Sequence, residues 1–116
     1  MKRFLAVYTG SPEARAAWDQ LPEAERQRRE AAGMAAWRAW AAKHAAVISE
    51  MGGPLGRTKL VAKGGIADIR NAMAAWTVVQ AESHEAAARL FVDHPHFTIF
   101  PGAGVEVMEV MPVPGG

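Results

Sequence analysis

The last third of the chain carries the pattern that most restricts its fold. Ser83 can cap a helix, and apolar residues follow it at helical spacing as far as the corner that contains Pro95. Proline cannot continue a helix, so the helix is expected to end there, and the chain then becomes extended. The predicted order in this half is strand, strand, helix and strand, at residues 57–63, 74–82, 83–93 and 104–111.

The first half begins with a predicted strand at residues 2–9, whose side chains are nearly all apolar, as in a strand that is central in its sheet. Ser11, Pro12 and Glu13 form a helix-start signal. Helices are predicted at residues 12–19 and 22–51. The second of these has an apolar stripe at three- and four-residue steps, made by Met34, Trp37, Ala41, His44, Ile48 and Met51.

These elements predict one domain over residues 1–116, with the order βαββαβ. Right-handed crossovers then favour a ferredoxin-like fold of the α+β class, a four-stranded antiparallel sheet with the helices on one face. Strands that are apolar on both faces cannot leave the other face in water. A homodimer through the exposed sheet face is therefore expected, closed in part by Phe97, Ile99, Phe100 and the strand near residues 105–110.

The composition excludes several classes of site. The chain has no cysteine, which rules out disulfides, zinc–thiolate sites, iron–sulfur clusters and thiol nucleophiles. A formal net charge of +1 provides no strong field for nucleic acid or for an anionic membrane, so neither partner is expected. The apolar run at the N-terminus is too short for a signal peptide, which predicts a cytoplasmic protein. No cofactor is predicted.

Few side chains are suited to catalysis. His44 lies on the apolar stripe, where burial would lower its pKa and leave a neutral imidazole able to act as a general base. The alternative is a core histidine that is hydrogen-bonded to a backbone carbonyl. His94 and His96 flank Pro95, but two imidazoles at this spacing lack the geometry of a helical metal-ligand pair, so no metal site is predicted.

Tryptophan is frequent in this chain, and three of the indoles could line a cleft between helix and sheet. These are Trp37, Trp40 and Trp76. Aromatic walls around one imidazole are typical of a small-ligand site, whereas core packing is the structural alternative.

Four segments together resemble the YCII-related family of the dimeric α+β barrel superfamily. They are MAAWRAW, GGPLGRTKLVAKGG, AMAAWTVVQAESHEAAARLF and GVEVMEVMPV. The resemblance implies a ferredoxin-like protomer that pairs sheet to sheet. It also implies an active-site pair, a histidine in the first helix and an aspartate before the proline. Here His44 lies about one turn from the first position, and His94 takes the second, which makes both the candidate catalytic residues.

Three function classes stay open. The first is a small-molecule enzyme of isomerase, lyase or cofactor-free oxygenase type, with His44 as base. The second is a non-catalytic binder of a small ligand in the same cleft. The third is a structural homodimer whose cleft is filled by side chains. An open cavity at the histidine would distinguish the first two classes from the third.

Overall fold

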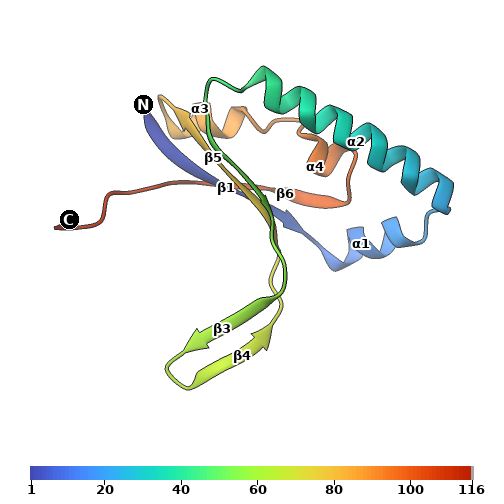
Figure 1. Cartoon of the computed structure of the whole chain (residues 1–116), viewed down its shortest axis with the longest axis horizontal. Helices are drawn as coiled ribbons and strands as arrows, with labels where there is room; N and C mark the ends of the chain where they lie inside the picture. The colour runs from blue at the N-terminus through green and yellow to red at the C-terminus, as the bar shows by residue number, and fades with distance from the viewer. Residues whose placement is uncertain (116) are drawn as a thin grey trace.

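A computed structural model describes residues 1–115 and contains one main sheet covered by helices (Figure 1). The strands of the sheet lie in the order β2-β5-β1-β6, all antiparallel to their neighbours, and are β1 (Lys2–Gly10), β2 (Ile48–Pro54), β5 (Met73–Ala81) and β6 (Gly102–Glu109). The helices are α1 (Pro12–Asp19), α2 (Glu23–Lys43), α3 (His84–Arg89) and α4 (Pro95–Thr98). The predicted ferredoxin-like α+β architecture is confirmed, with β1 in the interior of the sheet.

The core lies between this sheet and the helices. In β1, alternate residues Phe4, Ala6 and Tyr8 are fully buried, and Phe4 lies opposite Val79 of β5. The side chains that surround them come from both layers and include Trp40, Ala81, Ala87 and Phe91. Burial of this apolar face is what holds the helices on one side of the sheet.

Two helix starts form as their local sequences predict. The hydroxyl of Ser11 accepts a hydrogen bond from the backbone N–H of Ala14 at 3.1 Å, at the start of α1. Ser83 does the same for Ala86 at the start of α3. A side-chain oxygen at this position satisfies one backbone donor that the helix itself leaves unpaired, so both starts are fixed locally.

The predicted end of the long helix is wrong. Helix α2 ends at Lys43, and the rest of its predicted length forms a turn at residues 44–47 and then the first part of β2, which pairs along the edge of β5. The backbone N–H of Gln80 in β5 donates to the carbonyl of Val47 at 2.7 Å. An open edge of a sheet presents backbone groups that need partners, and this demand outweighs the helical spacing of the side chains.

The predicted second sheet strand is also displaced. Residues 57–63 contain β3 (Thr58–Ala62), which pairs with β4 (Gly65–Ile69) and not with the main sheet. This hairpin projects away from the rest of the chain (Figure 1). Its strands are exposed along nearly their whole length.

The segment after Pro95 is expected from the sequence to lie outside regular structure, and this expectation is wrong as well. Helix α3 ends at Arg89, earlier than predicted, and Pro95 starts the short helix α4. Phe100 follows α4 and packs against Trp18 and Trp37, with ring centroids at 6.1 and 6.2 Å. Phe100 is thereby held within its own protomer.

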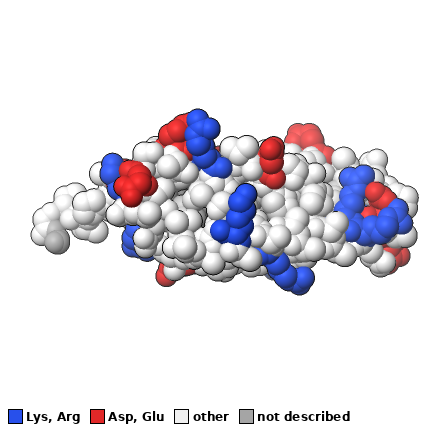
Figure 2. All heavy atoms as spheres, turned by 90° about the horizontal axis from the view of Figure 1, so that it is seen from above, with Lys and Arg blue, Asp and Glu red and all other residues white. Residues whose placement is uncertain are grey.

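Charged side chains of both signs are interspersed on the face seen in Figure 2. One such cluster lies on α2, where Glu25 binds Arg28 and Arg29. The hydrogen bond from Arg29, followed by that from Arg28, lowers the pKa of Glu25. Within residues 1–115, no helix is both long enough and apolar enough to cross a bilayer.

Candidate functional site

A cleft of about 530 Å³ lies between α2 and the strands β2 and β5, on the helix-covered side of the sheet. We call it the helix–sheet cleft. Its lining is mostly apolar and includes Met34, Trp37, Met51, Ala75, Tyr8 and Phe100. Of the described residues that line it, only His96 carries an imidazole. A mostly apolar cleft with few polar groups is the usual composition of a small-ligand site.

Two polar residues of the cleft, Tyr8 and Thr77, are occupied by internal hydrogen bonds. The hydroxyl of Thr77 donates to the carbonyl of Met51 at 3.0 Å, so the hydroxyl of Tyr8 must donate to Thr77 Oγ1, at 3.1 Å. Burial raises the pKa of Tyr8 to about 12, although the hydrogen bond to Thr77 opposes this shift. Tyr8 is therefore a neutral phenol and is not suited to remove a proton.

His96 is the side chain of the cleft that is suited to acid–base chemistry. Its Nε2 lies 2.7 Å from the carbonyl oxygen of Thr9. Because a carbonyl can only accept, Nε2 carries the hydrogen, and the neutral ring keeps a lone pair on Nδ1. Burial lowers the pKa of His96, while the hydrogen bond to Thr9 opposes this effect. The side chain is thus a neutral imidazole with a fixed tautomer, the form that a general base requires.

Two neighbours set the position of the His96 ring. Nδ1 of His94 accepts the backbone N–H of His96 at 3.0 Å, which fixes the first turn of α4. On the other side lies Gly102, where an added Cβ would overlap both the ring and the backbone carbonyl of His96. The absence of a side chain at position 102 is what lets the imidazole reach Thr9.

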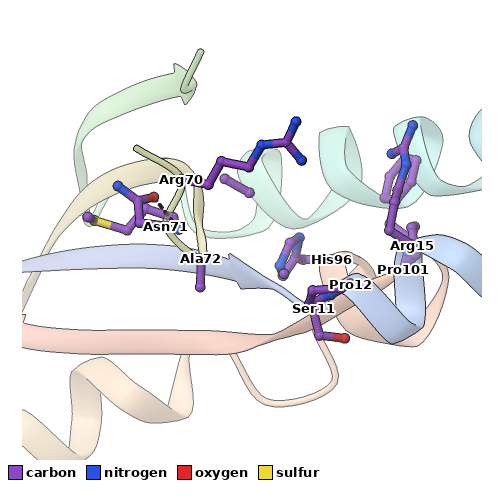
Figure 3. Close-up of a pocket in the computed structure, with 13 residues that line it drawn as sticks. Ser11, Pro12, Arg15, Arg70, Asn71, Ala72, His96 and Pro101 are labelled. Atoms are coloured by element: carbon purple, nitrogen blue, oxygen red, sulfur yellow. Dashed lines mark hydrogen bonds between the residues drawn. The ribbon is translucent and has the colours of Figure 1, made fainter. Parts of the chain in front are cut away.

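A second cleft, of about 730 Å³, adjoins the first. The two share Ala74, His96 and Phe100. The second cleft also carries Arg15 and Arg70, so we call it the arginine cleft; in the view of Figure 3, Arg70 lies above His96 and Arg15 lies to the right.

His94, a predicted catalytic residue, is buried and lies outside the lining of both clefts. It is 1% exposed and is surrounded by the rings of Tyr8, Trp37, Trp40 and Phe91. Its Nε2 has no hydrogen-bond partner within residues 1–115. Burial, with a smaller contribution from the neighbouring histidines, lowers the pKa of His94 to about 4. Its visible role is to position His96, and its catalytic role stays a prediction.

His44 does not reach either cleft. It directly follows the last residue of α2, so it does not lie within the helix as predicted, and it is half-buried. Its ring centroid lies 5.4 Å from that of Trp40. Burial, and secondarily the charge of Lys43, lowers the pKa of His44, which is the expected direction. A catalytic role for His44 stays a prediction.

The three tryptophans divide between the cleft and the core. Trp37 lines the helix–sheet cleft, and Trp76 lines it from β5. Trp76 pairs with Val7, so strand alternation places its side chain on the sheet face that the helices leave bare. Trp40 lies outside both linings, 9% exposed, and its Nε1 donates to the carbonyl of Leu90 at 2.7 Å. Trp40 is therefore a core residue, which was the alternative to a place in the cleft wall.

From sequence, His96 was weighed only as a metal ligand beside His94, and its place in a cleft was missed. The signal that could have identified it is Pro95 between the two histidines. Proline at the first position of a helix fixes the backbone there, and so the direction of the next side chain. In the part of the chain that the structure describes, no three His, Cys, Asp or Glu side chains gather as metal ligands.

Comparison with known proteins identifies a fold and no family. No family model and no curated protein matches the sequence. Among solved structures, the chain is similar to the 5-chloro-2-hydroxyhydroquinone dehydrochlorinase of Burkholderia phenoliruptrix AC1100, in complex with 2,5-dihydroxybenzoquinone. The TM-score is 0.54 at 18% identity, over 94% of this chain and 93% of the other. The two chains share a fold, and membership of the YCII-related family stays a prediction.

Proposed function

We propose that this protein is a small-molecule enzyme in which the helix–sheet cleft binds a flat apolar ring and Nδ1 of His96 removes a proton from it. The observation that carries the proposal is the hydrogen bond from Nε2 of His96 to the carbonyl of Thr9. It leaves the basic nitrogen free in a side chain that lines an apolar cleft. His96 thereby takes the role that the sequence suggested for His44.

The chemistry of the cleft supports this assignment. Removal of a proton from a phenol, an enol or a carbon acid is a step that isomerases, lyases and cofactor-free oxygenases can share, and a positioned base contributes about 10²- to 10⁴-fold to such a step. Apolar walls and the ring of Phe100 suit an aromatic or quinonoid ligand. The similar solved structure holds a ligand of this shape, 2,5-dihydroxybenzoquinone.

The test uses 2-naphthol as a binding probe and 5-chloro-2-hydroxyhydroquinone as a trial substrate. In His96→Gln, the amide nitrogen can still donate to Thr9, but no base is left. We expect naphthol binding to persist and chloride release to fall by about 100-fold or more. The matched control is His84→Gln, because His84 also bonds a backbone carbonyl, that of Val107, but lies outside both clefts.

Equal turnover by His96→Gln and the unchanged protein would contradict the proposal. Binding of naphthol without turnover of any phenolic substrate would favour the non-catalytic binder. Failure to bind any aromatic ring would leave only a structural role.

We also propose that the chain belongs to the dimeric α+β barrel superfamily and pairs with a second copy through the face of the sheet that the helices leave bare. On this face Leu5 lies opposite Val78 on one side and Met108 on the other, and Val7 lies opposite Trp76. Met108 is 40% exposed in the single protomer. Glu106 lies opposite Val7 at the edge of this face, and the other paired side chains named are apolar. A largely apolar sheet face is unfavourable in water, and an identical face on a second copy would cover it.

Sedimentation equilibrium at micromolar concentration tests the dimer. We expect a dimer for the unchanged chain and a shift towards monomer for Met108→Lys, which places a charge on the sheet face proposed as the interface. Val92→Lys is the control, because Val92 is 66% exposed and follows α3 on the helical side. A monomeric unchanged chain would contradict this proposal without affecting that for His96.

A further inference from the structure

We propose that the arginine cleft holds the carboxylate of the ligand, so that the ligand is a small aromatic acid whose ring lies beside His96. The inference rests on the proposed function, because it assumes that the ring occupies the helix–sheet cleft. The two clefts adjoin at Ala74, His96 and Phe100, so one molecule can reach from the first into the second.

Three separate segments build the arginine cleft. Arg15 comes from α1, Arg70 from the loop between β4 and β5, and His96 from α4. In Figure 3 the side chains of Arg70 and Arg15 lie above and to the right of His96. Apolar side chains of Phe100 and Met73 complete the lining. A ligand bound here would interact with the two guanidinium groups at one end and would make apolar contacts along the rest of its length.

The neutral polar groups of the cleft are largely occupied within the protein. Ser11 Oγ caps α1 through Ala14. The side chain of Asn71 accepts from the backbone of Met73 at 2.9 Å and donates to Thr58 at 3.2 Å. These groups hold the walls of the cleft in place and leave the recognition of a ligand to other side chains.

The two guanidinium groups keep spare donors. Arg15 uses only Nε in its ion pair with Asp19, at 3.4 Å, which leaves its terminal nitrogens free among the described residues. No ion pair joins Arg70 to another residue within 1–115. None of the described lining residues is Asp or Glu. The unfilled hydrogen-bonding capacity of the cleft is thus cationic and favours an anion.

The donor geometry favours a carboxylate over a phosphate. A guanidinium presents two parallel N–H groups that match the two oxygens of a carboxylate. Phosphate sites usually add a cluster of backbone N–H groups at a helix start. Here Pro12 has no N–H, and the N–H of Ala14 is used by Ser11. The start of α1 therefore has few free N–H groups to bind the additional oxygens of a phosphate.

The experiment compares 2-naphthoate with its neutral analogue 2-naphthamide by isothermal titration calorimetry at constant ionic strength. For the unchanged protein we expect the acid to bind about tenfold more tightly than the amide. Arg70→Gln and Arg15→Gln should each reduce this preference, and Arg70→Lys should restore it only in part, because lysine keeps the charge and loses the paired donors. Both arginines are exposed, so these variants are expected to fold.

Two control variants locate the effect. Arg89→Gln removes an exposed cation that pairs with Glu85 far from the cleft, and should change nothing. Arg38→Gln removes the cation that lines the helix–sheet cleft, and should leave the preference for the acid intact. Loss of the preference in Arg38→Gln, with no change in Arg70→Gln, would overturn the inference.

The outcomes also separate this inference from the proposed function. If acid and amide bind equally, the role of the arginines is wrong and the aromatic cleft stands. If neither binds, both proposals fail. Inorganic phosphate that displaces naphthoate as strongly as benzoate does would overturn the carboxylate as the preferred group.

Discussion

Nε2 of His96 donates a hydrogen bond of 2.7 Å to the carbonyl oxygen of Thr9, a residue 87 positions earlier in the chain. The bond joins α4 to the end of β1 and decides which imidazole nitrogen is basic. His96 is 8% exposed, so the bond is largely shielded from competing water. The candidate site depends on this contact more than on any other.

The titration of His96 is the first prediction. Burial lowers its pKa below the usual value of about 6.5, so the ring should be neutral at pH 7 and become charged only at lower pH. Binding or turnover that needs the free Nδ1 should therefore fall as the pH drops through that lowered pKa. Nitrogen NMR of the imidazole should show hydrogen on Nε2 and none on Nδ1 at neutral pH. A midpoint at or above 6.5 would refute this.

The second prediction concerns Gly102. In Gly102→Ala the new Cβ would overlap the His96 ring and backbone, so the ring must move away from Thr9. We expect a loss of about 1–3 kcal/mol in the free energy of unfolding, the usual cost of overpacking, together with weaker ligand binding. Denaturant unfolding and ligand titration measure the two effects.

Gly104→Ala is the matched control on the same strand. Its nearest neighbour to an added Cβ is the hydroxyl of Thr9 at 4.0 Å, so the methyl group fits without displacement. We expect its stability to stay within about 0.5 kcal/mol of the unchanged protein. Equal losses in both variants would mean that the effect belongs to the strand and not to His96.

The third prediction is a loss of stability in mild acid through His94. Its pKa is about 4 in the folded protein and about 6.5 in the unfolded chain, so between these values the unfolded state binds the extra proton. The free energy of unfolding should therefore decrease as the pH falls from about 6.5 to about 4. Below pH 4 this group should cause no further decrease. The full effect is about 3 kcal/mol in order of magnitude.

Denaturant unfolding at a series of pH values would measure this loss. In His94→Asn the amide oxygen can still accept the backbone N–H of His96, but the titrating group is gone. This variant should start less stable, because the smaller side chain leaves a cavity, yet lose less stability between pH 6.5 and 4. The same acid sensitivity in both proteins would assign the effect to other groups.

The fourth prediction distinguishes a tryptophan that stabilises the core, Trp40, from one that contacts the ligand, Trp37. Trp40→Phe removes the Nε1–H donor and leaves the carbonyl of Leu90 without it, at a cost of about 1–3 kcal/mol in stability. Because Trp40 lies outside both cleft linings, affinity for 2-naphthol should change little. Trp37→Ala should instead weaken naphthol binding, since Trp37 lines the helix–sheet cleft. Calorimetry on both variants is the check, and a large loss of affinity in Trp40→Phe would count against this division.

The local sequence was sufficient to predict an element whose formation depends only on residues close to it in the chain. The starts of α1 and α3 depend on Ser11 and Ser83, which bond backbone groups three residues away. The alternation in β1 also places Phe4, Ala6 and Tyr8 on one buried face without reference to any distant partner. Such signals are readable because the interacting groups lie within one helical turn or one strand.

The end of α2 could not be predicted in this way. Ile48 and Met51 continue the helical spacing of apolar residues, and that pattern alone favours a longer helix. The open edge of β5 recruits the same residues as strand β2. Pairing of a strand with a distant edge satisfies several backbone groups at once, and this outweighs a local preference of a few tenths of a kcal/mol per residue.

The sequence by itself determined the order and type of most elements, the ferredoxin-like class and two residues that line the helix–sheet cleft, Trp37 and Trp76. Only the tertiary structure decided that His96, and not His44, lines the cleft. That choice depends on the carbonyl of Thr9, which lies 87 positions away at the end of β1, and on the bare Cα of Gly102 at the start of β6. A contact between residues far apart in the chain has no local pattern, because it exists only once the sheet has formed.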